Sequence, residues 1–160
     1  MRAAADNVEF VAVTQPEQIQ VAQDLFREYA QAIGVDLEFQ GFAAELAGLP
    51  APYALPGGVL LLAQIGGQTG GCVAMRRLDA RIGEMKRLYV RSAHRGQRIG
   101  EKLVDAVIDA ARRANYHALR LDTLPSMASA QGLYRKLGFV EIPAYNSTHL
   151  PGTRFYELEL

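Results

Sequence analysis

The chain has 160 residues and a formal net charge of zero at pH 7, because 17 Lys and Arg residues balance 17 Asp and Glu residues. Nucleic-acid binders carry a basic excess and disordered tail proteins a strong charge imbalance, so this composition argues against both classes. The length predicts one domain over residues 1–160, with a core large enough to fold without disulfides or structural metals.

A single cysteine, Cys72, excludes an internal disulfide and a metal cage built from cysteines, and we expect no metal. The chain starts without an apolar run, so we expect no signal peptide. Its longest apolar run, over residues 59–63, is far shorter than a membrane span. These features predict a cytoplasmic protein with neither membrane nor nucleic-acid partners, and they leave a homodimer open.

The first part of the chain predicts a strand followed by two helices. Alternating side chains indicate the strand over residues 8–14. A helix is expected over residues 16–33, with Thr14 as its N-cap, because apolar residues recur on one helical face until Gly34. A short helix over residues 38–47 and a loop rich in Pro and Gly over residues 50–58 come next.

The rest of the chain predicts an antiparallel meander followed by alternating helices and strands. A loop with Gly96 and Gly100 leads from the meander into a helix that has one apolar face and ends near Asn115. This order favours an α+β fold with a mixed sheet. The expected strands cover residues 59–65, 69–77, 83–90, 118–123, 139–142 and 154–160, and a further helix covers residues 125–137.

Charged residues are unevenly distributed along the chain. Residues 1–75 contain two basic and eight acidic side chains, whereas residues 76–120 contain twelve basic and five acidic ones. The basic stretch includes the loop at residues 95–100, which opens a helix whose first N–H groups are unpaired and whose dipole is positive there. Because glycines let an anion approach the backbone closely, this loop predicts a pyrophosphate site. Four basic side chains surround it: Arg91, Arg95, Arg98 and Lys102.

Other interpretations of this loop were weighed against the pyrophosphate site. The glycines alone also fit a tight turn with solvated arginines. A Walker A loop is excluded, because Gly100 is followed by Glu101 and not by the required Lys-Ser/Thr pair. A dinucleotide-binding fingerprint, with Asp122 as its acidic residue, ranks low because Gln97 and Arg98 stand where glycines are required.

Two motifs in this order resemble those of the GCN5-related N-acetyltransferase (GNAT) family. The first is Arg95-Gly96-Gln97-Arg98-Ile99-Gly100, and the second is Ala130-x-x-Leu133-Tyr134-x-x-x-Gly138-Phe139. The first departs from the family pattern at Arg98, where glycine is usual and a positive φ is costly for arginine. Before the second, Met127 replaces an asparagine that is common in the family.

The resemblance implies an acyl-CoA N-acyltransferase fold of the GNAT type, with a mostly antiparallel mixed sheet flanked by about four helices. It implies acetyl-CoA as the acyl donor and a primary amine, on a small molecule or exposed on a protein, as the acceptor. Strand residues Leu88, Tyr89 and Val90 would pair with the pantetheine arm. The pyrophosphate would bind to Arg95, Gly96, Gln97, Arg98, Ile99, Gly100 and Glu101.

The resemblance also implies catalytic roles for Tyr134 and Glu84. Tyr134 would lie near the CoA sulfur and protonate the leaving thiolate, since phenol and thiol pKa values of about 10 and about 8.5 are roughly matched. Glu84 would take the proton of the amine, a role for which a carboxyl pKa of about 4.3 requires burial or a relaying water. By pattern alone, Tyr134 also fits a core position and Glu84 a cross-strand pair.

Two segments outside the motifs are candidates for the acceptor pocket. Residues 37–42 carry aromatic side chains, and residues 145–152 form a long connection between the last two strands. Both also fit simpler roles, in the core and in a surface hairpin. The acidic N-terminal part would favour a cationic acceptor. Two other functions stay open: a non-catalytic acyl-CoA-binding or sensor module and, with less support, a nucleotide-binding oxidoreductase.

Overall fold

The computed structural model describes residues 7–160; residues 1–6, and the expectation that the chain starts without a signal peptide, lie outside this range. Every strand expected from the sequence is present within a few residues of its predicted bounds. The elements in chain order are β1 (Val8–Ala12), α2 (Pro16–Ile33), η1 (Leu37–Gln40), α3 (Phe42–Gly48), β2 (Val59–Ile65), β3 (Gln68–Arg77), β4 (Ile82–Val90), η2 (Ser92–His94), α4 (Ile99–Arg113), β5 (Ala118–Thr123), α5 (Ala128–Lys136), β6 (Val140–Ile142) and β7 (Arg154–Glu159).

Within residues 7–160 the strands form a seven-stranded sheet in the order β1-β2-β3-β4-β5-β7-β6. Neighbouring strands are antiparallel except β4 and β5, which pair in parallel. Tight turns join β2, β3 and β4, whereas α4 connects β4 to β5, because parallel neighbours need a longer crossover. The predicted mixed, mostly antiparallel sheet flanked by helices is therefore confirmed.

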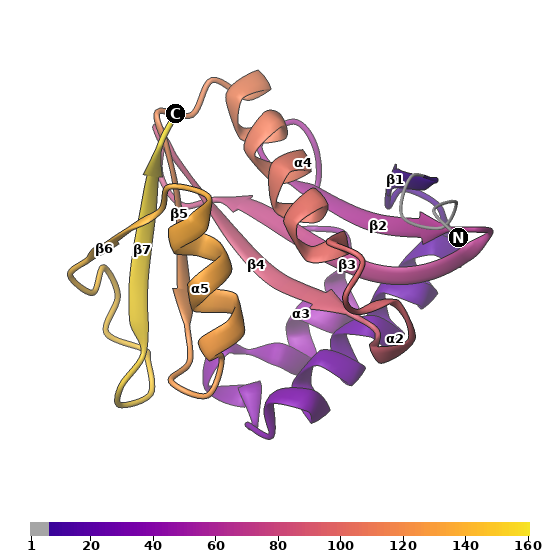
Figure 1. Ribbon diagram of the computed structural model, residues 1–160, viewed down its shortest axis with the longest axis horizontal. Coiled ribbons are helices and arrows are strands. Elements are labelled where there is room, and N and C mark those ends of the chain that lie inside the picture. Colours follow the sequence, from indigo (N-terminus) through magenta and orange to yellow (C-terminus); the bar gives the residue numbers. More distant parts are fainter. Residues whose placement is uncertain (1–6) are drawn as a thin grey trace.

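The parallel pair β4–β5 opens into a wedge. The two strands pair only over residues 82–84 and 118–120, although β4 continues to Val90. Figure 1 shows that they diverge beyond this point. The register between β3 and β4 shifts at the same level, and Arg87 has a φ of 62°. Such a bulge bends a strand and increases its twist, so β4 turns away from β5.

Helices cover both faces of the sheet (Figure 1). On one face α4 buries its apolar stripe, which includes Leu103, Val107 and Ala111. On the other face α2 buries Leu25 and Phe26. Both helices show the apolar spacing expected from the sequence, and the sheet divides the core into two hydrophobic clusters.

Two local predictions about the first helices are wrong. The N-cap of α2 is Gln15 and not Thr14, because Gln18 Oε1 accepts the N–H groups of both residues, at 2.9 and 2.8 Å. The helix predicted over residues 38–47 is divided into η1 and α3 by Gly41, whose φ is 72°. Glycine reaches this left-handed conformation without a side-chain clash, so the chain changes direction there.

Candidate active site

The loop between β4 and α4 presents a row of unpaired backbone donors. The N–H groups of residues 96–101 have no acceptor in the described part of the chain. Gly96 has a φ of 80°, and Arg98, directly before α4, has a φ of 60° and a ψ of 23°. Arg98 therefore adopts the left-handed backbone conformation that glycine usually provides at this position of the motif. An anion at this position would meet several backbone donors and the positive end of the α4 dipole.

The basic side chains around this loop have different partners. The Arg91 guanidinium makes two hydrogen bonds to the Glu28 carboxylate on α2, at 2.7 and 3.0 Å, so its charge is already paired. Arg95 Nε donates to the Val90 carbonyl at 3.1 Å. All the predicted pyrophosphate residues except Gln97 line an open cavity of about 250 Å³. The donors and the space therefore fit a pyrophosphate group, while Arg91 serves to tie the loop to α2.

One edge of β4 is free in the wedge. Beyond residue 84, this edge has no strand partner among residues 7–160. It carries Leu88, Tyr89 and Val90, whose segment pairs with β3 on the opposite edge. A free strand edge offers alternating N–H and C=O groups to an extended ligand. An arm that contains amide groups, such as pantetheine, therefore fits this edge by strand-like pairing.

Tyr134, on α5, lines the wedge as well as the core. Its side chain is 4% exposed, and its ring lies 5.8 Å from the ring of Phe139 and 6.3 Å from that of Tyr156, centroid to centroid. It also lines a small cavity between β4 and β5, together with Leu88. Burial raises the pKa of Tyr134, so the phenol keeps its proton at neutral pH. The sequence left a core position and a site position as alternatives for Tyr134. In the structure this residue packs in the core and also lines the cavity of the wedge.

Glu84 lies where the wedge opens and is only 1% exposed. Its carboxylate accepts hydrogen bonds from Arg76 Nε at 2.8 Å and from the Tyr145 hydroxyl at 2.6 Å. Arg76 is its direct neighbour on β3, so the cross-strand pair that the sequence allowed is present. Burial and the charge of Glu84 raise the pKa of Tyr145, which keeps this phenol a donor.

A cavity of about 250 Å³ lies beside Glu84 and contains charged residues that the sequence analysis did not single out for this site. Asp122 had been considered only for a dinucleotide fingerprint. The alternation of Glu84 and Lys86 along β4 was a usable signal, since residues two apart on a strand share one face. No local pattern pointed to Arg76, Arg87 and Glu45, because they come from β3, β4 and α3. The charged residues added by the structure are Glu45, Arg76, Lys86, Arg87 and Asp122.

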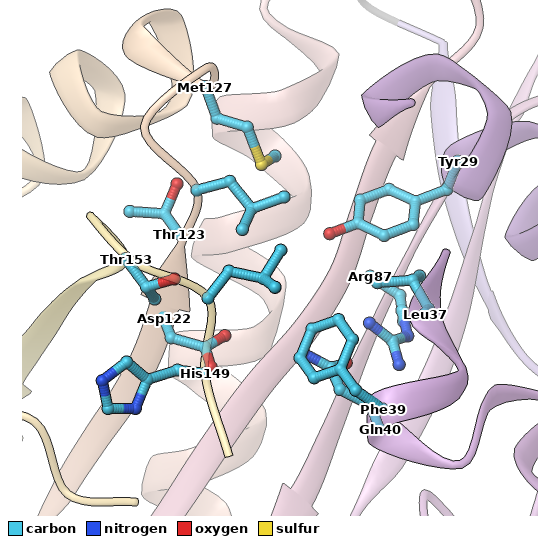
Figure 2. Close-up of a pocket in the computed structure, with 12 residues that line it drawn as sticks. Tyr29, Leu37, Phe39, Gln40, Arg87, Asp122, Thr123, Met127, His149 and Thr153 are labelled. Atoms are coloured by element: carbon cyan, nitrogen blue, oxygen red, sulfur yellow. The ribbon is translucent and has the colours of Figure 1, made fainter. Parts of the chain in front are cut away.

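A second pocket adjoins this cavity, and Gln40, Arg87 and Asp122 line both. Figure 2 shows the side chains of Tyr29, Phe39 and Gln40 on one side and Asp122 and His149 on the other. The Asp122 carboxylate points from β5 across the pocket (Figure 2). Both segments that the sequence suggested for an acceptor pocket line this pocket, 37–42 through Phe39 and 145–152 through His149.

Three features together define an acyl-CoA-dependent acyltransferase fold: the wedge between β4 and β5, the loop of unpaired N–H groups at residues 96–101 (the donor loop), and the α4 connection between the parallel strands. The chain matches the model of the Acetyltransferase (GNAT) family over residues 20–139 and belongs to this family. It is an acetyltransferase, as the sequence motifs predicted, and acetyl-CoA-dependent N-acetylation is the general activity of its relatives.

Relatives and solved structures agree with this assignment. An N-acetyltransferase of Schizosaccharomyces pombe is 35% identical over 156 residues, which cover 96% of each chain. A GNAT acetyltransferase of Staphylococcus aureus superimposes with a TM-score of 0.77 at 24% identity, covering 95% of this chain and 98% of that one. An acetyltransferase of Salmonella typhimurium, whose structure contains acetyl-CoA, has a TM-score of 0.72 at 20% identity and covers 95% and 93% of the two chains.

Two further observations concern only residues 7–160. No three His, Cys, Asp or Glu side chains gather there in an arrangement that would hold a metal ion. None of the helices in this range combines the length and the apolarity that crossing a membrane requires.

Proposed function

We propose that the chain transfers the acetyl group of acetyl-CoA to a primary amine, on a small molecule or exposed on a protein, and that residues 1–160 form a single domain for this reaction. One observation carries the proposal. The unpaired N–H groups of residues 96–101 lead into the free edge of β4, and this edge leads to the cavity lined by Tyr134. A donor with a pyrophosphate at one end and a thioester at the other needs such a path.

Acetyl-CoA, when bound, supplies the acetyl group as a thioester. The acceptor nitrogen forms a bond to the acetyl carbon while the bond between this carbon and sulfur breaks. Tyr134 donates its proton to the departing sulfur, and its buried phenol is held protonated for this step. Glu84 takes the proton that the amine loses, directly or through a water. The ammonium thus loses one proton to Glu84 before the attack, and the second proton, which leaves the nitrogen as the amide forms, replaces the one that Tyr134 gave to sulfur.

The amine needs a base because its ordinary pKa of about 10.4 keeps it protonated at neutral pH. Glu84 suits this role by position, since two hydrogen bonds fix its carboxylate at the mouth of the wedge. Its partners Arg76 and Tyr145 orient it, and they also line the cavity where an acceptor has room. The bond to Tyr145 brings the loop between β6 and β7 to the acceptor side of the site.

The proposal is tested by ligand-dependent thermal stabilisation and by release of free CoA thiol. Acetyl-CoA and CoA are expected to stabilise the protein, whereas NAD and NADP are not, and a panel of primary amines is expected to include acceptors that release thiol. Stabilisation by NAD instead would support the oxidoreductase alternative and refute the proposal. Stabilisation by acetyl-CoA without transfer to any amine would support the binding or sensor module.

Location and oligomeric state stay predictions. The cytoplasm is proposed as the compartment, to be checked by fractionation of cells that express the tagged protein. The homodimer that the sequence left open is checked by sedimentation equilibrium.

A further inference from the structure

The charged side chains that line the cavity beside Glu84 are mostly paired with one another. Arg76 binds Glu84 at 2.8 Å. Arg87 binds Glu45 through two hydrogen bonds, at 2.7 and 3.0 Å. These pairs neutralise four of the charges, because each guanidinium faces a carboxylate; the Arg87 pair is buried, whereas the Arg76 side chain is 40% exposed.

Lys86 and Asp122 are the two charged side chains of this lining that have no such partner. Within residues 7–160, neither side chain makes a hydrogen bond or an ion pair. Burial lowers the pKa of Lys86, and the negative charges of Glu84 and Asp122 oppose this change. Both groups are partly buried, so each has lost hydration that no protein group replaces.

The strand geometry places these two residues opposite each other across the wedge. Glu84 and Arg120 are the last register partners of β4 and β5, and Lys86 and Asp122 stand two residues further along each strand. Side chains alternate along a strand, so Lys86 and Asp122 point to the same face as that last pair. Because the strands diverge there, the ammonium and the carboxylate do not come within the 4 Å of an ion pair.

A third polar group in this cavity also lacks a partner. Gln40 Oε1 is buried and receives no hydrogen bond within the described residues. In Figure 2, Gln40 lies across the pocket from Asp122. The three side chains without partners thus offer two hydrogen-bond acceptors, Gln40 Oε1 and the Asp122 carboxylate, and one cation, Lys86.

We infer that the acceptor is a small zwitterion of the amino-acid type, whose ammonium group binds Asp122 and Gln40 and whose carboxylate binds Lys86. This inference rests on the proposed function, because it names the acceptor of that reaction. A zwitterion satisfies both unpaired charges at once, whereas a simple amine leaves Lys86 without a counter-charge. A cavity of about 250 Å³ has room for a free amino acid, and the proposed base Glu84 lines the same cavity.

The inference is tested with matched acceptors that differ only at the carboxylate: L-leucine, L-leucinamide and 3-methylbutylamine, with the corresponding sets for alanine, phenylalanine and aspartate. Acetylation is followed by thiol release and by mass spectrometry of the product. At least one amino acid is expected to exceed its amide and its decarboxylated amine about 10- to 100-fold in kcat/KM, since a hydrogen bond between charged groups accounts for such a factor.

Variants then assign the preference to a residue. Lys86→Gln is expected to lower kcat/KM for the amino acid about 10- to 100-fold. The acid-over-amide ratio, which is kcat/KM for the amino acid divided by kcat/KM for its amide, should then fall close to one. Lys86→Arg keeps the charge and should keep most of this ratio. Asp122→Asn is expected to raise KM for the amino acid, the amide and the amine alike. Arg113→Gln, at the exposed far end of α4, removes the same charge and is the matched control.

The outcomes separate this inference from the function on which it rests. Equal acetylation of acids, amides and amines, or a Lys86→Gln variant with an unchanged acid-over-amide ratio, overturns the zwitterionic acceptor and leaves the N-acetyltransferase in place. Acetyl-CoA binding without transfer to any amine overturns both.

Discussion

Arg87 and Glu45, which are 42 residues apart in the sequence, form a buried ion pair with two hydrogen bonds of 2.7 and 3.0 Å. The side chains are 3% and 9% exposed. Arg87 has a left-handed backbone at the bulge of β4, and its guanidinium also lies over the rings of Tyr29 and Phe42. The pair therefore ties α3 to the residue at which β4 leaves β5.

Removal of one partner of this pair is expected to destabilise the fold strongly. Glu45→Gln leaves the Arg87 guanidinium buried without a counter-charge, which costs about 3–5 kcal/mol in free energy of unfolding. Asp24→Asn, which breaks the exposed pair with Arg27, is the control and is expected to cost less than about 1 kcal/mol. Urea denaturation measures both. Equal effects of the two substitutions would contradict a special role for the buried pair.

Tyr134→Phe is expected to lower kcat about 10²- to 10⁴-fold, the range associated with a lost general acid, while acetyl-CoA affinity changes little. Tyr156→Phe is the matched control, because this ring is a neighbour of Tyr134 but its hydroxyl bonds Arg135 and does not line the wedge cavity. Steady-state kinetics and calorimetry with acetyl-CoA give the two quantities. Normal turnover in Tyr134→Phe would leave Tyr134 as a core residue only.

Arg98 combines a left-handed backbone with a charged side chain in the donor loop. Arg98→Gly and Arg98→Ala both remove the guanidinium, but only glycine relieves the backbone strain. We expect the glycine variant to be more stable than the alanine variant by about 1 kcal/mol. Both should bind acetyl-CoA with equally reduced affinity. Equal stability in urea would show that Arg98 does not hold a strained conformation.

The lowered pKa of Lys86 predicts a pH-dependent effect on stability. Between the folded pKa and the ordinary value of 10.5, the unfolded chain binds more protons at this position, so stability rises with pH in that window. Below the window the charged Lys86 is fully destabilising. Lys86→Met is therefore expected to be more stable than the parent at pH 7, with a difference that shrinks as the pH approaches 10.5.

Denaturant midpoints of both proteins, measured side by side from pH 7 to pH 10, test this effect. A difference that grows with pH would contradict a lowered Lys86 pKa. The matched control is Arg113→Met. Its difference in stability from the parent should not change over this pH range, because arginine stays charged throughout.

Much of the fold, and the loop proposed to bind acetyl-CoA, could be predicted from the sequence. The strands of the meander, the apolar face of α4 and the loop at residues 95–100 are local patterns, and each appears in the structure where it was expected. The loop was recognisable because its donors are consecutive backbone groups. Arg91 was assigned to the anion site because it is near in sequence, whereas its guanidinium binds Glu28 on α2.

The cavity proposed to bind the acceptor amine could not be predicted from local sequence patterns in the same way. Glu45, Lys86 and Asp122 lie on α3, β4 and β5, and no spacing along the chain relates them. The segments 37–42 and 145–152 were named as candidates, but which of their side chains face the cavity depends on how the loops fold over the sheet.

The sequence by itself determined the family, the order of the elements and the loop of consecutive backbone N–H groups proposed for the pyrophosphate, because these depend on residues close together in the chain. It also showed an acidic first part and a basic middle part, without a reason for either. Only the tertiary structure paired them, through Glu28–Arg91 and Glu45–Arg87. Among residues 7–160 it also left Lys86 and Asp122 without ion-pair partners across the wedge, because the divergence of β4 and β5 holds the two charges apart.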